Sequence, residues 1–176
     1  MEAAVKEIVI ERLATRESPR EIFVQDFKSI GELPIHGGWG YSKEDAVIID
    51  KDDPIVPPGR SFDGIGIEHV FVEKRIYEEL IIFRPAGWKH LGIGWERIEQ
   101  RLVVGDDDRK YDVLRFDVTA FPEAEWEALK TEWEESDYGQ SPDFDHEAHQ
   151  SKREAAMVHY VAEYWFDITS FFGRYD

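Results

Sequence analysis

A glycine-rich segment that leads directly into an apolar segment gives the first firm constraint on how this chain folds. Glycine occupies positions 37, 38 and 40, and residues 46–49 are all apolar. Glycine adopts backbone conformations that other residues avoid, and short apolar runs bounded by turn residues are typical of buried strands. The segment between residues 34 and 50 therefore predicts a tight turn followed by a buried strand over residues 45–50.

This turn is also a candidate site, because binding residues often lie in loops held by a rigid strand. Its sequence matches neither the Walker A nor the GxGxxG phosphate-binding pattern, and Ser42 does not lie in a GxSxG motif. Two interpretations stay open: the glycines only permit tight packing, or the turn contacts a ligand or partner. The second gives these candidate pocket residues: His36, Gly37, Gly38, Trp39, Tyr41 and Asp50. No cofactor is predicted.

The segments on either side of the turn are short. Residues 5–10 are rich in β-branched side chains and predict a strand. Ser18 followed by Pro19 is typical of a helix start, so residues 20–27 predict a helix, although residues 22–24 also fit a strand. Residues 51–63 contain three prolines, which predict an irregular loop.

The pattern of residues 64–83 fits both a helix and strands. Acidic residues pair with His69 and Lys74 at a spacing of four, which favours a helix, whereas the apolar residues 80–83 favour a strand. We expect a helix, or a strand with a helical turn, that passes into a strand at residues 80–83. Residues 99–104 and 111–119 predict a β-hairpin, because the connection between them is rich in glycine and aspartate.

Two helices are predicted in the C-terminal third. Pro122 at the first helical position and the glutamates after it predict a helix over residues 122–135. Its apolar face contains Trp126 and Trp133, which we expect in the core. Asp145 caps a second, long helix that runs to about residue 172, in which His159 and Glu163 form a buried pair.

These elements predict an α+β fold for residues 1–176, organised as a single domain. Its antiparallel or mixed sheet is covered by the two C-terminal helices. A chain of 176 residues with 42% hydrophobic residues is long enough to bury one core. The sequence contains no cysteine, which excludes disulfides and cysteine-based zinc sites.

The formal net charge of −17 limits the classes of partner. Nucleic acids and anionic membranes would be repelled, so neither is predicted as a partner. Between residues 121 and 147 there are ten acidic residues and one basic residue, Lys130. This excess predicts an acidic surface for a basic protein partner, formed by Glu125, Glu127, Glu132, Glu134 and Glu135.

One cluster in this acidic stretch has the composition of a metal site. His146 and His149 are three residues apart at the start of the predicted helix, and Asp143 or Asp145 could complete the ligand set. The alternative is ordinary helix capping and solvated surface. Asp50, Asp52 and Asp53 offer a similar choice between a Mg²⁺ site and a solvated turn.

The general profile, small, free of cysteine, strongly acidic and rich in aromatic residues, is similar to that of bacterial immunity and antitoxin proteins that neutralise a basic toxin. This resemblance of composition implies a cytoplasmic binding protein that is not an enzyme. The alternative is a small enzyme or ligand-binding protein with its pocket at residues 36–43. The first residues do not have the pattern of a secretory signal, and no apolar run reaches the ~20 residues of a membrane span.

Overall fold

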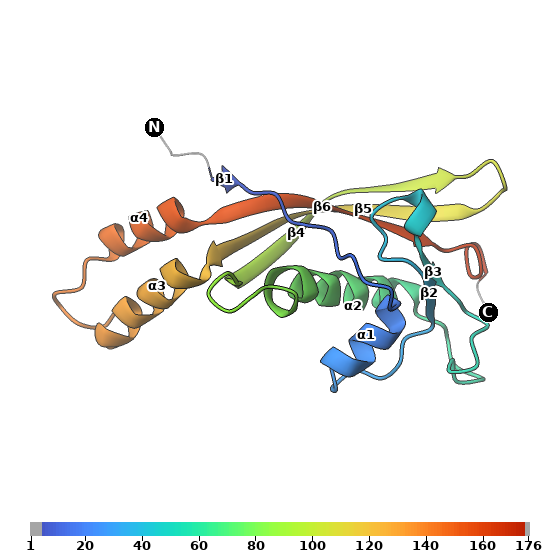
Figure 1. Ribbon diagram of the computed structural model, residues 1–176, viewed down its shortest axis with the longest axis horizontal. Coiled ribbons are helices and arrows are strands. Elements are labelled where there is room, and N and C mark those ends of the chain that lie inside the picture. Colours follow the sequence, from blue (N-terminus) through green and yellow to red (C-terminus); the bar gives the residue numbers. More distant parts are fainter. Residues whose placement is uncertain (1–4, 175–176) are drawn as a thin grey trace. The chain divides into compact units, whose positions relative to one another are not determined.

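The computed structural model describes residues 5–174, and within these residues it contains one six-stranded sheet and four α-helices (Figure 1). The strand order is β2-β3-β6-β5-β4, and β1 also pairs with β6. β3 and β1 run parallel to β6, whereas β2 and β3 are antiparallel, so the sheet is mixed. The α+β prediction is confirmed. The strands are β1 Lys6–Glu7, β2 Ile35–Gly37, β3 Val47–Ile49, β4 His90–Val104, β5 Lys110–Pro122 and β6 Val158–Asp167.

The helices are α1 Pro19–Asp26, α2 Gly64–Tyr77, α3 Glu123–Glu135 and α4 His146–Ala156. A 3-10 turn, η1 Lys43–Asp45, precedes β3, and a π-helical turn, η2 Glu78–Ile82, follows α2. α1 begins at Pro19 with Ser18 as its N-cap, as the sequence predicts. The predicted loop at residues 51–63 and the predicted hairpin, formed by β4 and β5, are also confirmed.

The chain forms two compact units, and the three long strands contribute to both. The first unit contains residues 5–11, 79–96 and 117–161, and the second contains residues 12–78, 97–116 and 162–174. The single-domain organisation expected for residues 1–176 stays a prediction. Each unit is described separately below.

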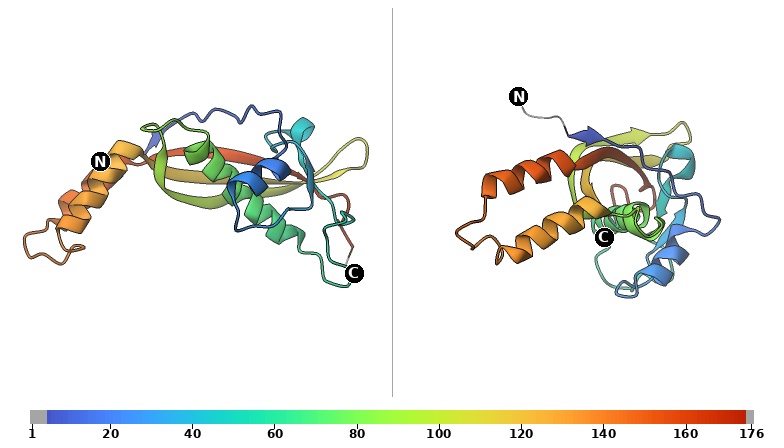
Figure 2. Two further views of the ribbon diagram at one scale, coloured as in Figure 1. Left: turned by 60° about the horizontal axis from the view of Figure 1, so that its bottom comes forward. Right: turned by 60° about the vertical axis from the view of Figure 1, so that its left-hand side comes forward.

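In the second unit, α2 lies against the sheet (Figure 2), where the ring of Phe71 contacts Phe166 of β6 at a centroid distance of 5.6 Å. Phe23 of α1 packs on Phe71 and on Trp39, which is only 6% exposed. Arg75 is buried among these rings, with its guanidinium 3.8 Å from the centroid of the Tyr164 ring. The core of this unit therefore contains a cluster of aromatic rings around the guanidinium of Arg75.

In the first unit, α3 continues directly from β5, and α4 leads into β6 (Figure 1). These two helices pack against each other, and we call them the α3–α4 hairpin. The predicted arrangement, in which two C-terminal helices cover the sheet, is not confirmed. The loop between the helices contains three consecutive residues with positive φ, Asp137, Tyr138 and Gly139.

The long helix predicted from residue 145 to 172 is wrong, because α4 ends at Ala156 and residues 158–167 form β6. Burial alternates along most of this strand, with the even-numbered residues from Val158 to Phe166 buried. His159 and Glu163 therefore do not form the predicted helical pair. Instead, His159 Nδ1 lies 2.9 Å from Asp117 Oδ1 of β5.

The strand predicted at residues 80–83 is also wrong, because η2 occupies residues 78–82. This segment continues the direction of α2 with one wider turn, a feature that often occurs at functional sites. Glu78, the first residue of η2, is fully buried.

Candidate functional site

The β2–β3 hairpin positions His36 and Asp50 on the outer side of the sheet edge. Ile35 pairs with Ile49 and both are buried, so the neighbouring positions His36 and Asp50 point away from this core. The hairpin continues past the last strand residue, because the backbone N–H of Asp50 donates to the carbonyl of Pro34 at 2.9 Å. Regular strand pairing therefore fixes both side chains on one face.

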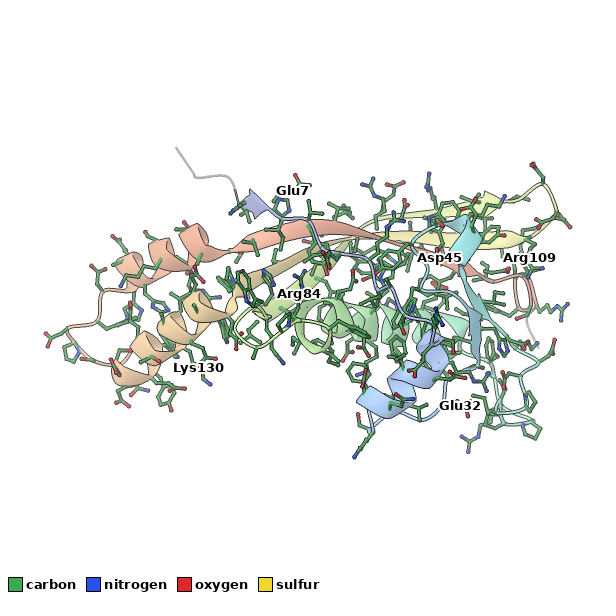
Figure 3. The ribbon with its side chains drawn as sticks, in the orientation of Figure 1. Glu7, Glu32, Asp45, Arg84, Arg109 and Lys130 are labelled. Carbon is green, nitrogen blue, oxygen red and sulfur yellow. The ribbon has the colours of Figure 1, made fainter. Side chains whose placement is uncertain are left out.

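The glycine-rich turn is tight for a steric reason. Gly37 has φ +83°, and a Cβ atom at Gly38 would lie 2.6 Å from the carbonyl oxygen of Asp45. The backbone N–H of Gly40 donates to the same carbonyl at 2.8 Å, and the backbone N–H of Ser42 donates to Asp45 Oδ1 at 2.7 Å (Figure 3). The glycines therefore allow close packing of the turn against Asp45.

The two aromatic residues of this turn pack inward. Trp39 belongs to the core, and Tyr41 is half-buried, with its ring 4.0 Å from the guanidinium of Arg75. The hydroxyl of Tyr41 accepts a hydrogen bond from the backbone N–H of Leu13 at 3.1 Å. Among the predicted pocket residues, the structure therefore brings His36 and Asp50 together and places Trp39 away from them, in the core.

His36 and Asp50 meet a third residue, Asp53, which the sequence analysis grouped with Asp50 but not with His36. His36 Nε2 lies 3.2 Å from Asp50 Oδ2 and 3.0 Å from Asp53 Oδ2. The metal-ligating atoms of these three residues all lie within 4.8 Å of one another. Within residues 5–174, no other group of three or more histidine, aspartate or glutamate residues meets this criterion. We call these three residues the His36 cluster.

Asp53 is held in the cluster by an ion pair. Its side chain is 2% exposed, and Arg20 of α1 donates to both of its carboxylate oxygens. The hydrogen bond from Arg20 lowers the pKa of Asp53, and burial only partly opposes this effect. The same pair raises the pKa of Arg20. Arg20 Nε also lies 2.6 Å from Glu32 Oε1, so one guanidinium holds two carboxylates.

The second unit contains two cavities, one of which is lined by a residue of the cluster. One, of about 400 Å³, is lined by Asp53 and by the proline-rich loop that follows it. The other, of about 470 Å³, is lined by Glu32, by Pro34 and by apolar residues of α2 and the same loop. Only the first cavity therefore reaches the cluster, through Asp53.

The four residues of the predicted metal site, Asp143, Asp145, His146 and His149, are used differently. Asp145 caps α4, since its carboxylate accepts from the backbone N–H of Ala148 at 3.0 Å. His149 is buried, and its Nδ1 lies 3.1 Å from Glu132 Oε1. His146 packs edge-on against Phe144, with a centroid distance of 4.7 Å. The four side chains do not form a ligand set like that of the His36 cluster.

The α3–α4 hairpin contains an apolar groove of about 620 Å³. On α3 the groove is lined by the apolar side chains of Trp126, Leu129 and Trp133. On α4 it is lined by the imidazole rings of His146 and His149 and by the guanidinium of Arg153. Trp133 is 38% exposed, so the expectation that it lies in the core is wrong. Tyr138, in the loop between the helices, is 61% exposed.

The α3–α4 hairpin carries many acidic side chains, although the groove itself is lined by Lys130 and Arg153 and by no acidic residue. Residues 123–156 contain eleven acidic and three basic residues, a net charge of −8, and nine of the eleven acidic residues are exposed. Of the predicted partner surface, Glu125, Glu127, Glu134 and Glu135 are exposed. Glu132 is instead half-buried, and hydrogen bonds from Lys152 and then from His149 lower its pKa. Lys130, whose charge opposes theirs, is also on α3 (Figure 3).

Two further glutamates of the second unit are buried and hold protons. Burial, together with a hydrogen bond to Asp112, raises the pKa of Glu68 to about 9. Burial, with a smaller contribution from Asp26, raises the pKa of Glu78 to about 9 as well. Both carboxyl groups are therefore neutral at pH 7.

No protein-family model, curated protein or solved structure matches this chain. Among residues 5–174, every helix is too short or too polar to cross a membrane.

Proposed function

We propose that this chain is a binding protein whose α3–α4 hairpin engages a basic protein partner. The observation that carries the proposal is the combination found on this hairpin. An apolar groove with an exposed tryptophan lies on a segment, residues 123–156, of net charge −8. The similarity of composition to immunity and antitoxin proteins points to the same class of partner.

The charge of the hairpin supplies attraction and orientation. Acidic and basic surfaces that match increase the rate of encounter and disfavour partners of the wrong charge. The exposed glutamates lie on α3, the helix that also contributes Trp126, Leu129 and Trp133 to the groove, so the attraction is concentrated on the α3–α4 hairpin. A basic partner is therefore favoured over a neutral or acidic one.

The groove supplies the contacts that hold the partner. A few aromatic and arginine side chains carry most of the energy of typical protein interfaces. Trp133 is held in place by ring contacts with Phe144 and His149, and it keeps 38% of its surface exposed. An ordered and exposed indole is suited to insertion between apolar and basic side chains of a partner.

The test compares two variants of the full chain that carry the same change in net charge. The first replaces Glu125, Glu127, Glu134 and Glu135 with glutamine. The second, the matched control, replaces four exposed glutamates elsewhere, at positions 11, 17, 21 and 44. Each protein is immobilised and exposed to a lysate of the source cells at ~0.05 M and ~0.5 M salt, since the screening length falls from above 10 Å to about 4 Å over this range.

A retained protein is then identified, purified and titrated against each variant. We expect a basic protein that is released at ~0.5 M salt, that binds the control variant normally and that binds the α3 variant at least tenfold more weakly. Trp133→Ala should weaken binding by a similar factor with little effect on the salt dependence. Equal binding to the two glutamine variants, or an acidic partner, would refute the proposal.

A further inference from the structure

We propose that the His36 cluster binds a divalent transition-metal ion. The proposal is independent of the partner surface, because no residue of the α3–α4 hairpin takes part in it. His36 and Asp50 of the cluster lie on the β2–β3 hairpin, and Asp53 lies at the start of the proline-rich loop. Arg20 of α1 pairs with Asp53.

The two carboxylates are oriented by the backbone. Asp50 Oδ1 accepts from the N–H of Asp52 at 2.9 Å, and Asp53 Oδ1 accepts from the N–H of Ile55 at 3.0 Å. The other oxygen of each carboxylate, Oδ2, faces His36 Nε2. Asp53 Oδ2 also accepts from Arg20. Three atoms of the kinds that ligate metals therefore converge at one point.

The distances between these atoms suit an ion among them. Ligand atoms that each lie about 2.0–2.2 Å from one ion, in tetrahedral or octahedral geometry, are about 3–3.5 Å from one another. His36 Nε2 lies at 3.0 Å and 3.2 Å from the two carboxylate oxygens. A single ring nitrogen offers one proton or one lone pair, so it satisfies only one of two carboxylates. A cation contacts all three atoms at once.

The charge of the surroundings also favours a cation. Asp50, Asp53 and Glu32 carry three negative charges when ionised, and Arg20 carries one positive charge, which leaves an excess of two negative charges. A divalent ion balances this excess. Arg20 fixes Asp53 from the side, as residues that contact metal ligands commonly do, and such contacts tune the affinity of metal sites.

The ligand types indicate the class of ion. One imidazole nitrogen with two carboxylate oxygens suits Zn²⁺ and neighbouring first-row ions better than Ca²⁺ or Mg²⁺, which prefer oxygen ligands alone. His36 is 46% exposed at its side chain and Asp50 is 29% exposed, so an ion can enter from solvent. Three protein ligands leave at least one coordination position for water.

The test is calorimetric titration of the full chain with Zn²⁺, after treatment with a chelator and dialysis. We expect one ion bound per chain. His36→Gln and Asp50→Asn should each weaken the affinity at least about 100-fold, since even residues behind the ligands contribute 10–100-fold. His69→Ala is the matched control, because His69 is an exposed histidine of the same unit outside the cluster, and it should leave the affinity unchanged.

Both ligand positions are partly exposed, so these variants should fold, and circular dichroism checks this. A second pair, His36→Ala and Asp50→Ala, repeats the measurement if either substitution disturbs the fold. Absence of Zn²⁺ binding overturns the proposal. Binding that survives in folded His36 and Asp50 variants, or that is lost only in a His146→Ala, His149→Ala variant, overturns it as well.

Discussion

Glu68 gives this protein a stability that depends strongly on pH. It lies on α2, is 3% exposed and donates its proton to Asp112 of β5. Both oxygens of Asp112 also accept from Gln100 Nε2, at 3.2 Å and 3.0 Å. Burial first, and this hydrogen bond second, raise the pKa of Glu68 from 4.5 to about 9. The folded chain therefore keeps a proton on Glu68 that the unfolded chain releases above about pH 4.5.

The sign and size of the effect follow from this difference in pKa. Below pH 4.5 both states hold the proton, and the contribution of Glu68 to stability is fully present. As the pH rises from 4.5 toward 9, only the folded state keeps the proton, and this contribution is progressively lost. Each pH unit is equivalent to about 1.4 kcal/mol, so the loss between pH 5 and pH 8 is as much as about 4 kcal/mol. This is a large fraction of the roughly 5–15 kcal/mol of a typical domain.

Glu68→Gln tests this reasoning, because glutamine keeps a hydrogen-bond donor for Asp112 and cannot ionise. Urea unfolding at pH 5, 6, 7 and 8 should show a difference in unfolding free energy, variant minus unaltered chain, that rises by a few kcal/mol, up to about 4. Glu127→Gln, the same substitution at an exposed position, should give a small and constant difference. If the Glu68→Gln curve runs parallel to that of the unaltered chain, Glu68 ionises in the folded state and the argument is refuted.

Two further substitutions test the packing of the second unit, each by urea unfolding. Gly40→Ala should destabilise by about 1–3 kcal/mol, because Gly40 has φ +83° and a Cβ atom there would meet neighbours at 3.0–3.2 Å. Gly59→Ala, at φ +78° in open space, isolates the backbone strain and should cost less; equal losses would contradict the steric part of the argument. Arg75→Lys should destabilise by about 2–4 kcal/mol, because lysine cannot donate to the carbonyls of both Trp39 and Glu163. A change below about 0.5 kcal/mol would show that those carbonyls find other donors.

The elements that were predicted correctly are those with local signals. Pro19 begins α1 and the glutamates after Pro122 begin α3, because these residue types satisfy or complement the free ends of helices. The glycine and aspartate residues between β4 and β5 favour a turn by their own backbone preferences. None of these features requires knowledge of what packs against the element.

β6 was missed because its environment decides its structure. Apolar residues occupy so many positions after residue 156 that the pattern fits both a helix and a strand. β6 lies between β3 and β5, and pairing on both sides satisfies its backbone along much of its length. The switch occurs at Met157, which has extended dihedral angles, φ −62° and ψ 136°, directly after α4. Neighbouring strands, which the local sequence does not show, therefore set this boundary.

The candidate sites divide in the same way. His36 and Asp50 were predicted together because both lie in the glycine-rich segment between residues 34 and 50. Asp53 is held in the cluster by an ion pair with Arg20, which lies 33 residues away in the sequence. No local sequence pattern shows that pairing. The predicted site at residues 143–149 followed from histidine spacing alone. The alternative that the sequence also offered, helix capping, describes Asp145, whereas the contact of His149 with Glu132, 17 residues away, could not be read from spacing.

The buried polar residues of α2 explain why the pattern of residues 64–83 fits both a helix and strands. Its buried residues, at positions 64, 68, 71, 72, 75 and 76, lie on one side of a helix with 3.6 residues per turn. Two of them, Glu68 and Arg75, are polar, so they interrupt the apolar face that a helix is expected to have. The valines that remain are residues typical of strands. Glu68 is tolerated there because it keeps its proton, and Arg75 because backbone carbonyls and aromatic rings surround it. Glu68 therefore has two effects: its proton makes stability depend on pH, and its polar side chain interrupts the apolar pattern that would identify the helix.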